Sequence, residues 1–204
     1  MSHDVMIPKL TGASAIAAAV TTAAFWLLTL PLKTFVGAEV VRSPLWMPSQ
    51  ALHVAGALFA VFAFFGIYAV AGRAAGLAGA LACFLAVTGT ILFLADGIIA
   101  LAVFPALAEA APHLLTATGA MNQGIVLTTF ITCAVVNMIG NLAFAALLLR
   151  TPALRAPAIV LAIGGVLFNL PPGPVPLWLL AAGGVVWSIG LAWCGVRSAR
   201  LYEV

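Results

Sequence analysis

The sequence predicts an all-α integral membrane protein: a bundle of six transmembrane helices, with both termini in the cytoplasm and one membrane domain covering residues 1–204. Three observations support this. Of the 204 residues, 65% are hydrophobic and only 6% are charged, whereas a soluble domain carries about 25% charged residues. The apolar residues form runs close to the ~20 residues that a helix needs to cross a hydrocarbon core of about 30 Å. If these runs cross the membrane, most of the cations fall on one side of it.

The expected spans, in chain order, are 11–31, 51–71, 76–104, 121–149, 156–170 and 177–196. The first run is rich in alanine and ends at Pro31. We interpret it as a span rather than a signal peptide, because it is long for a signal core and no exported domain follows it. In the connector after it, Trp46 lies between Pro44 and Pro48. A tryptophan next to a span is typical of the lipid head-group level, and we expect Trp46 there.

The second span leads through the tight turn Gly72-Arg73 into the third, and we expect Pro105 to end that third span. The fourth span exceeds the minimum length, so tilt is expected. A short basic turn beginning at Arg150 leads into the fifth span. This span is short because Pro171-Pro172-Gly173-Pro174 stops it, and the sixth span ends just before Arg197.

The basic residues orient the bundle. With six spans, six of the eight cations share the side of both termini: Lys9, Arg73, Arg150, Arg155, Arg197 and Arg200. The other side holds only Lys33 and Arg42. Positive charge marks the cytoplasmic face, so we expect a multi-pass protein of the cell's inner (plasma) membrane, with the lipid bilayer as its surroundings. Cations scattered singly form no basic patch, so we expect no nucleic-acid partner.

Asp96 is the one acid within the predicted spans. An aspartate at the centre of a span costs about 2.5–3.5 kcal/mol on insertion scales, so it is a functional-site hypothesis by default. It lies eight residues before Phe104, about 12 Å of helix below the outer end. The same outer half collects further polar side chains, namely His53, Asn122, Gln123 and Asn169.

These residues favour a polar pocket that opens to the outer side. Asp96 lies at the bottom of this pocket as a charged or proton-carrying group. His53 is then the expected partner of Asp96, because histidine exchanges protons near neutral pH. The alternative is that Asp96 makes one interhelical hydrogen bond or ion pair that fixes packing. For His53, so close to the membrane boundary, a packing role is the stronger interpretation.

A polar stripe follows the fourth span, where Thr129, Cys133, Asn137 and Asn141 recur every four residues and so share one helix face. Such a stripe lines a pathway or binds helices together, at about 0.6 kcal/mol per hydrogen bond, and we favour the second role. The three cysteines lie in three different spans, which is typical of neither a disulfide framework nor a metal site. We expect no metal and no cofactor.

No catalytic or phosphate-binding motif is present in the sequence, and this weighs against an enzyme. Three hypotheses remain. The first is a protein that binds or transports a small molecule near Asp96. The second is a non-catalytic subunit or assembly factor, working with membrane partners or as a homo-oligomer. The third is a membrane-embedded enzyme acting on a lipid or isoprenoid, with Asp96 and His53 as acid and base.

Overall fold

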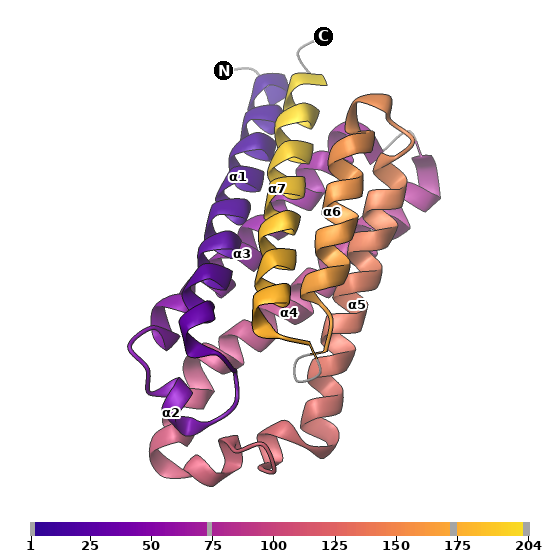
Figure 1. The fold of residues 1–204 in the computed structure, drawn as a ribbon. Helices are drawn as coiled ribbons and strands as arrows, with labels where there is room; N and C mark the ends of the chain where they lie inside the picture. The colour runs from indigo at the N-terminus through magenta and orange to yellow at the C-terminus, as the bar shows by residue number, and fades with distance from the viewer. Residues whose placement is uncertain (1–2, 73–74, 172–174, 202–204) are drawn as a thin grey trace.

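The computed structural model describes residues 3–72, 75–171 and 175–201, which form helices and no strand (Figure 1). Five helices are long and apolar enough to cross a membrane: α1 (His3–Thr29), α3 (Trp46–Ile67), α4 (Gly76–Ala110), α5 (Gly124–Leu148) and α7 (Leu177–Leu201). A further apolar helix, α6 (Arg155–Phe168), has 14 residues, about 21 Å at 1.5 Å per residue. The all-helical class is confirmed, and the five long apolar helices fit a multi-pass membrane protein.

The remaining elements are short. They are α2 (Ala38–Val41), a π-helical turn (Tyr68–Gly72) and four 3₁₀ turns (Leu30–Leu32, Pro112–Leu115, Ala120–Asn122 and Pro152–Leu154). Helix α2 lies in the connector between α1 and α3.

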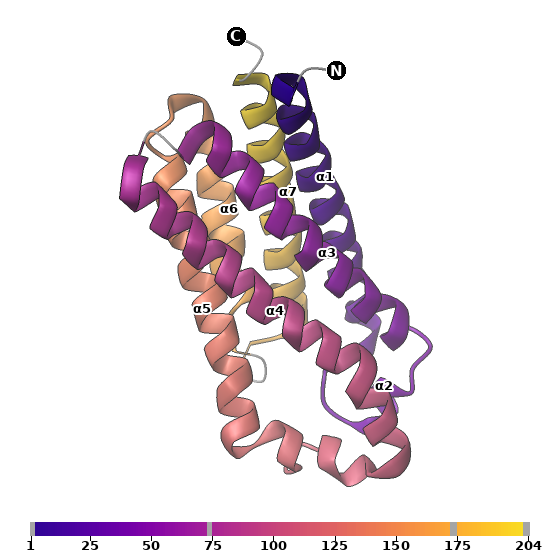
Figure 2. The same ribbon diagram turned by 180° about the vertical axis from the view of Figure 1, so that it is seen from behind.

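The six apolar helices form a closed ring, in which each packs against two neighbours in the order α1, α3, α4, α5, α6, α7 and back to α1. The start of α1 and the end of α7 lie side by side at one end, called here the terminal end (Figures 1 and 2). The α5–α6 turn, with Arg150 and Arg155, lies at the same end. The opposite end, with α2 and the segment 111–123, is called the connector end. Arg73, part of the predicted turn, lies outside the described residues.

Pro105 does not end its helix, because α4 continues to Ala110. Proline has no N–H for the carbonyl four residues earlier and weakens a helix at that point. The extension is held by packing, since Ala108 is buried in a small apolar cluster with α2, Trp46 and Leu115. The guanidinium of Arg42 also donates to the carbonyl of Ala108.

Trp46 is buried in the protein, with 1% of its surface exposed, rather than lying among lipid head groups. Its indole Nε1 donates to the carbonyl of Ala100 at 2.9 Å, five residues before Pro105. The ring stacks on Phe104 with centroids 6.1 Å apart. Trp46 therefore begins α3 and fastens it to the far part of α4.

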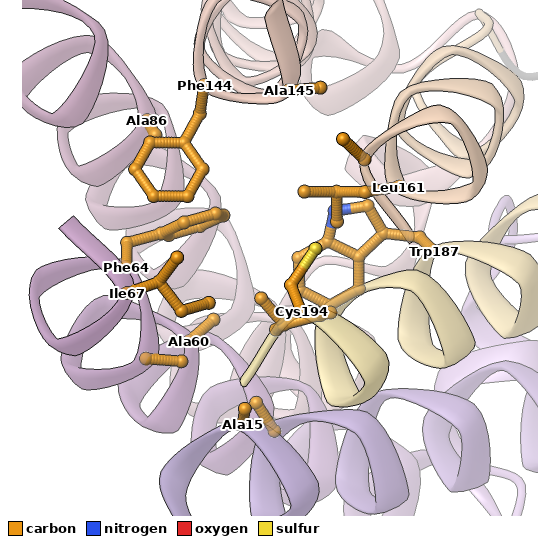
Figure 3. Close-up of a cluster of buried hydrophobic side chains, with 14 of the residues drawn as sticks. Ala15, Ala60, Phe64, Ile67, Ala86, Phe144, Ala145, Leu161, Trp187 and Cys194 are labelled. Carbon is orange, nitrogen blue, oxygen red and sulfur yellow. The ribbon is translucent and has the colours of Figure 1, made fainter. Parts of the chain in front are cut away.

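The interior at the terminal half of the ring is filled by fully buried apolar side chains (Figure 3). Phe64 of α3 and Phe144 of α5 meet edge to face, with ring centroids 4.9 Å apart. Leu161 of α6 and Cys194 of α7 close the centre from the other side, both without exposed surface. In a membrane such close packing supplies the attraction between helices, because lipid tails are as apolar as the side chains.

Glycines allow the closest helix contacts. A Cβ at Gly164 of α6 would overlap the backbone of Trp187 in α7, and one at Gly89 of α4 would meet the backbone of Asn137 in α5. Small residues at such contacts let helix backbones approach closely in membranes.

Helix α6 ends beside the middle of α5, well short of the first residue of α5. Asn169, which caps α6, donates from Nδ2 to Oδ1 of Asn137 at 3.1 Å. Asn137 lies 13 residues after Gly124, the first residue of α5, so α5 continues about 20 Å beyond the end of α6. Figure 1 shows α6 ending and α7 beginning partway along α5. This step leaves room between the helices in the connector half.

Candidate functional site

A pocket of about 310 Å³ lies where α6 and α7 stop short. Its wall comes from α1, α4, α5, α6, α7 and the adjoining loops, and it contains five aromatic rings: Trp26, Phe35, Phe93, Phe130 and Phe168. We call it the aromatic pocket. It lies in the same half of the molecule in which the sequence gathers its polar residues, but its lining is mostly apolar.

The rings of the pocket are packed against one another. Phe93 and Phe168 meet edge to face, with centroids 5.6 Å apart. Trp26 lies 6.2 Å from Phe168 and 6.3 Å from Phe35. These separations fall in the 4.5–7 Å range of favourable aromatic pairs, so the walls are held by contacts between helices distant in sequence.

Among the described residues, two buried polar atoms of side chains that line the pocket have no hydrogen-bond partner. Asn169 is 6% exposed, and its Nδ2 donates to Gly165 and Asn137, but its Oδ1 is unpaired. Trp26 is 4% exposed and its Nε1 is also unpaired. The indole lies against Gly184 of α7, where a Cβ would overlap it. Buried polar groups are rarely left unpaired, because each costs about 1–3 kcal/mol. Each of the two atoms has less than 1 Å² of accessible surface, so neither is open to the pocket.

His53 lies behind the pocket wall. It is buried between Phe25 and Phe93, with ring centroids 4.7 Å and 4.3 Å away. Its ring hydrogen-bonds the backbone of Phe93, and its Nε2 has no partner. His53 thus supports the Phe93 side chain that lines the pocket.

Two residues of the predicted stripe join Asn169 in a buried network between α5, α6 and α7. Asn141 donates from Nδ2 to Oδ1 of Asn137 at 2.8 Å, and its own Oδ1 accepts from Nε1 of Trp187 at 2.6 Å. Thr129, at the other end of the stripe, is exposed and bonds the carbonyl of Ile125. The amides of Asn137 and Asn141 thus hydrogen-bond α5 to Asn169 at the end of α6 and to Trp187 of α7.

Asp96 lies half-buried on α4, where its carboxyl hydrogen-bonds the thiol of Cys133 on α5. It is not among the residues that line the aromatic pocket. Within the described part of the chain, the structure gives it no ion pair or hydrogen bond with His53. The acid–histidine pair expected from the sequence is therefore not formed.

Asn122 and Gln123 lie in the loop before α5. The Nδ2 of Asn122 donates to the carbonyls of Leu115 and Thr116 at 3.0 and 3.1 Å, and Gln123 is exposed at the start of the helix. Asn122 thus holds the loop at the connector end. Over residues 3–72, 75–171 and 175–201, no three His, Cys, Asp or Glu residues gather as metal ligands.

Of the predicted site residues, only Asn169 lines the pocket. The aromatic lining was not predicted, because phenylalanines scattered through apolar spans look like ordinary core residues. One signal that could have pointed to it is the short fifth run before Pro171, because unusually short or proline-interrupted spans point to binding sites in transporters built from repeats.

Comparisons with protein-family models, with curated proteins and with solved structures give no match to this chain.

Proposed function

We propose that this chain is a membrane protein that binds a small lipophilic molecule in the aromatic pocket. The observation that carries the proposal is the pocket itself: about 310 Å³, walled by aromatic rings, with Asn169 as the polar residue of its lining. Ligand sites are typically concave and mostly apolar, have volumes of about 300–1,000 Å³ and contain a few polar groups that fix orientation.

The proposal includes the topology. Helix α6 is the sixth crossing, and both termini face the cytoplasm of a cell whose inner (plasma) membrane holds the protein. The shared terminal end supports an even number of crossings. The cations Arg150, Arg155, Arg197 and Arg200 at or near that end are exposed, and their position supports a cytoplasmic location.

Binding is better supported than transport. The terminal half of the ring is closed by fully buried side chains such as Phe64, Phe144 and Leu161. A molecule in the aromatic pocket therefore meets a packed core rather than a passage to the other side. Protein interiors filled by buried side chains contain few voids larger than a water molecule.

The test is saturable binding of radiolabelled 1-methylnaphthalene to the protein in lipid nanodiscs, with empty nanodiscs subtracted. Ala134→Phe fills the pocket from α5, and we expect at least a tenfold loss of affinity. Its control, Ile139→Phe, lies on the exposed surface of the same helix, outside the pocket lining, and leaves binding unchanged. Asp96→Asn also leaves binding within about twofold, because Asp96 is outside the pocket lining. Uptake equal to that of empty nanodiscs contradicts the proposal.

One observation favours a second role, as a non-catalytic subunit of a membrane complex. Helix α4 is the least buried of the five long apolar helices, and its exposed side chains include Ile91 and Ile98. This role predicts that a photo-crosslinker placed at Ile98 captures one discrete membrane protein in cells. Crosslinks to lipid alone argue against it.

A further inference from the structure

We propose that a groove between α4 and α5, at the terminal end of the ring, binds an anionic phospholipid. The groove has a volume of about 330 Å³ and shares no residue with the lining of the aromatic pocket. The described residues that line it are alanines, leucines and one cation, Arg150. An apolar groove with a cation at one end matches a lipid, in which an acyl chain is joined to a charged head group.

The groove begins where α4 and α5 are in closest contact. At Gly140 of α5 a Cβ would meet the carbonyl oxygen of Leu85 in α4. From Ala143, on the next turn of α5 toward the terminal end, the groove continues to Arg150. These two residues are seven positions apart, which is about 10 Å of helix. The groove therefore runs from the interior of the expected span to the basic turn at its end.

The walls of the groove are open to the surroundings of the protein. Ala82 and Leu147 are buried along its floor, while Leu81 and Ala146 are exposed at its edges. In a membrane these edges face lipid, and an acyl chain fills the groove because unfilled space loses van der Waals contacts. Such a surface accepts any acyl chain, so selectivity among lipids has to come from the head group.

Two guanidinium groups are available for the head group. The side chain of Arg150 is exposed and, within the described part of the chain, forms no hydrogen bond or ion pair. Arg155 is also exposed, and its Nε donates to the carbonyl of Leu149 at 3.1 Å, which holds its guanidinium beside Arg150. Guanidinium groups bind phosphate oxygens through paired hydrogen bonds. The described lining contains no acid that would compete for Arg150.

The position of the groove favours an anionic lipid over a zwitterionic one. A zwitterionic head group carries its own ammonium beside the phosphate, whereas an anionic head group keeps a net charge for the two arginines to neutralise. Basic pockets between helices on the cytoplasmic side bind anionic head groups in this way. The proposed topology places the terminal end on that side. The site does not depend on the aromatic pocket.

The test is native mass spectrometry of the purified protein in mild detergent, titrated with phosphatidylglycerol or with phosphatidylcholine of the same acyl chains. We expect the first phosphatidylglycerol to bind at least about fivefold more tightly, because a basic residue near a lipid head group contributes about a factor of five. Equal affinities for the two lipids overturn the proposal.

Arg150→Gln should reduce the preference for phosphatidylglycerol about fivefold. The matched control is Arg197→Gln, which removes the same charge from an exposed position of α7 outside the groove and should leave the preference unchanged. Equal losses in the two variants would show a general attraction to the basic end and overturn the site. Arg150→Gln does not threaten the fold, because the side chain that it replaces is exposed and has no partner among the described residues.

Ala146→Phe fills the groove and keeps both arginines, so it should weaken binding of both lipids. Ile139→Phe, exposed on the same helix outside the groove, is its control. Phosphatidylglycerol binding that Ala146→Phe leaves unchanged overturns the groove as the site of the acyl chain. Arg150→Gln should not alter the binding of 1-methylnaphthalene, so the lipid site and the aromatic pocket can fail separately.

Discussion

At the scale of single residues, Asn141 joins three helices through its amide. Its Oδ1 accepts from Trp187 of α7, and its Nδ2 donates to Asn137 on its own helix, whose Oδ1 also accepts from Asn169 at the end of α6. Asn141 has no exposed surface. Hydrogen bonds between membrane helices average about 0.6 kcal/mol, but removing one buried partner leaves the other unpaired at about 1–3 kcal/mol.

We therefore expect Asn141→Leu to lower the free energy of unfolding by about 1–3 kcal/mol, because it leaves the indole N–H of Trp187 without an acceptor. The measurement is thermal or chemical unfolding of the purified protein in mild detergent. Gln123→Leu, at an exposed position before α5, is the control. Equal stability of the two variants would show that the amide network does not hold the helices together.

At the scale of helices, the contact between α6 and α7 depends on the absence of a side chain at Gly164. A Cβ there would overlap the backbone N and Cα of Trp187, which have no free rotation that could move them away. Trp187, on the α7 side of this contact, also donates its indole N–H to Oδ1 of Asn141. A shift of α7 would thus disturb both the packing and the polar network.

We expect Gly164→Ala to destabilise the protein by about 1–3 kcal/mol, as overpacking of a tight contact does. Gly12→Ala is a matched control, because its Cβ would meet Ala199 at 3.6 Å, an ordinary contact distance. Differential scanning fluorimetry of both variants measures the effect. A Gly164→Ala protein as stable as Gly12→Ala would contradict the close approach of α6 and α7.

The sequence predicted helices better than it predicted their ends. Run length and composition indicated the apolar helices, because a bilayer sets a minimum length that single residues do not change. The predictions of a helix end at Pro105 and of a head-group position for Trp46 were wrong because tertiary contacts outweigh local sequence preference there. Ala108 and Trp46 are buried in one cluster, which holds α4 beyond its proline. The early end of α6 relative to α5 follows from Pro171. The aromatic lining of the pocket depends instead on packing between helices that are distant in sequence.

At the scale of the whole molecule, the interior of the ring is filled by apolar side chains in the terminal half, and the aromatic pocket lies in the connector half. The start of α1, the end of α7, the α5–α6 turn and most of the described cations lie in the terminal half. The grouping of cations is what the positive-inside rule requires of cytoplasmic residues. In the proposed topology, the aromatic pocket lies nearer the outer face.

The proposed topology predicts which exposed positions react from outside the cell. In a variant whose three buried cysteines are replaced by alanine, Glu109→Cys at the connector end should react with a membrane-impermeant maleimide in intact cells. Arg155→Cys at the terminal end should react only after the membrane is opened. The reverse pattern would place the termini outside, and reaction of both sites in intact cells would rule out a barrier between the two ends.

The most direct measurement of the central claim is a crystal structure of the protein with 1-bromonaphthalene, read by the anomalous signal of bromine. We expect the bromine peak inside the aromatic pocket, within van der Waals contact of Phe93 and Phe168. Peaks confined to the lipid-facing surface of the helices, with the pocket empty at saturating compound, would contradict the claim that this pocket binds small lipophilic molecules.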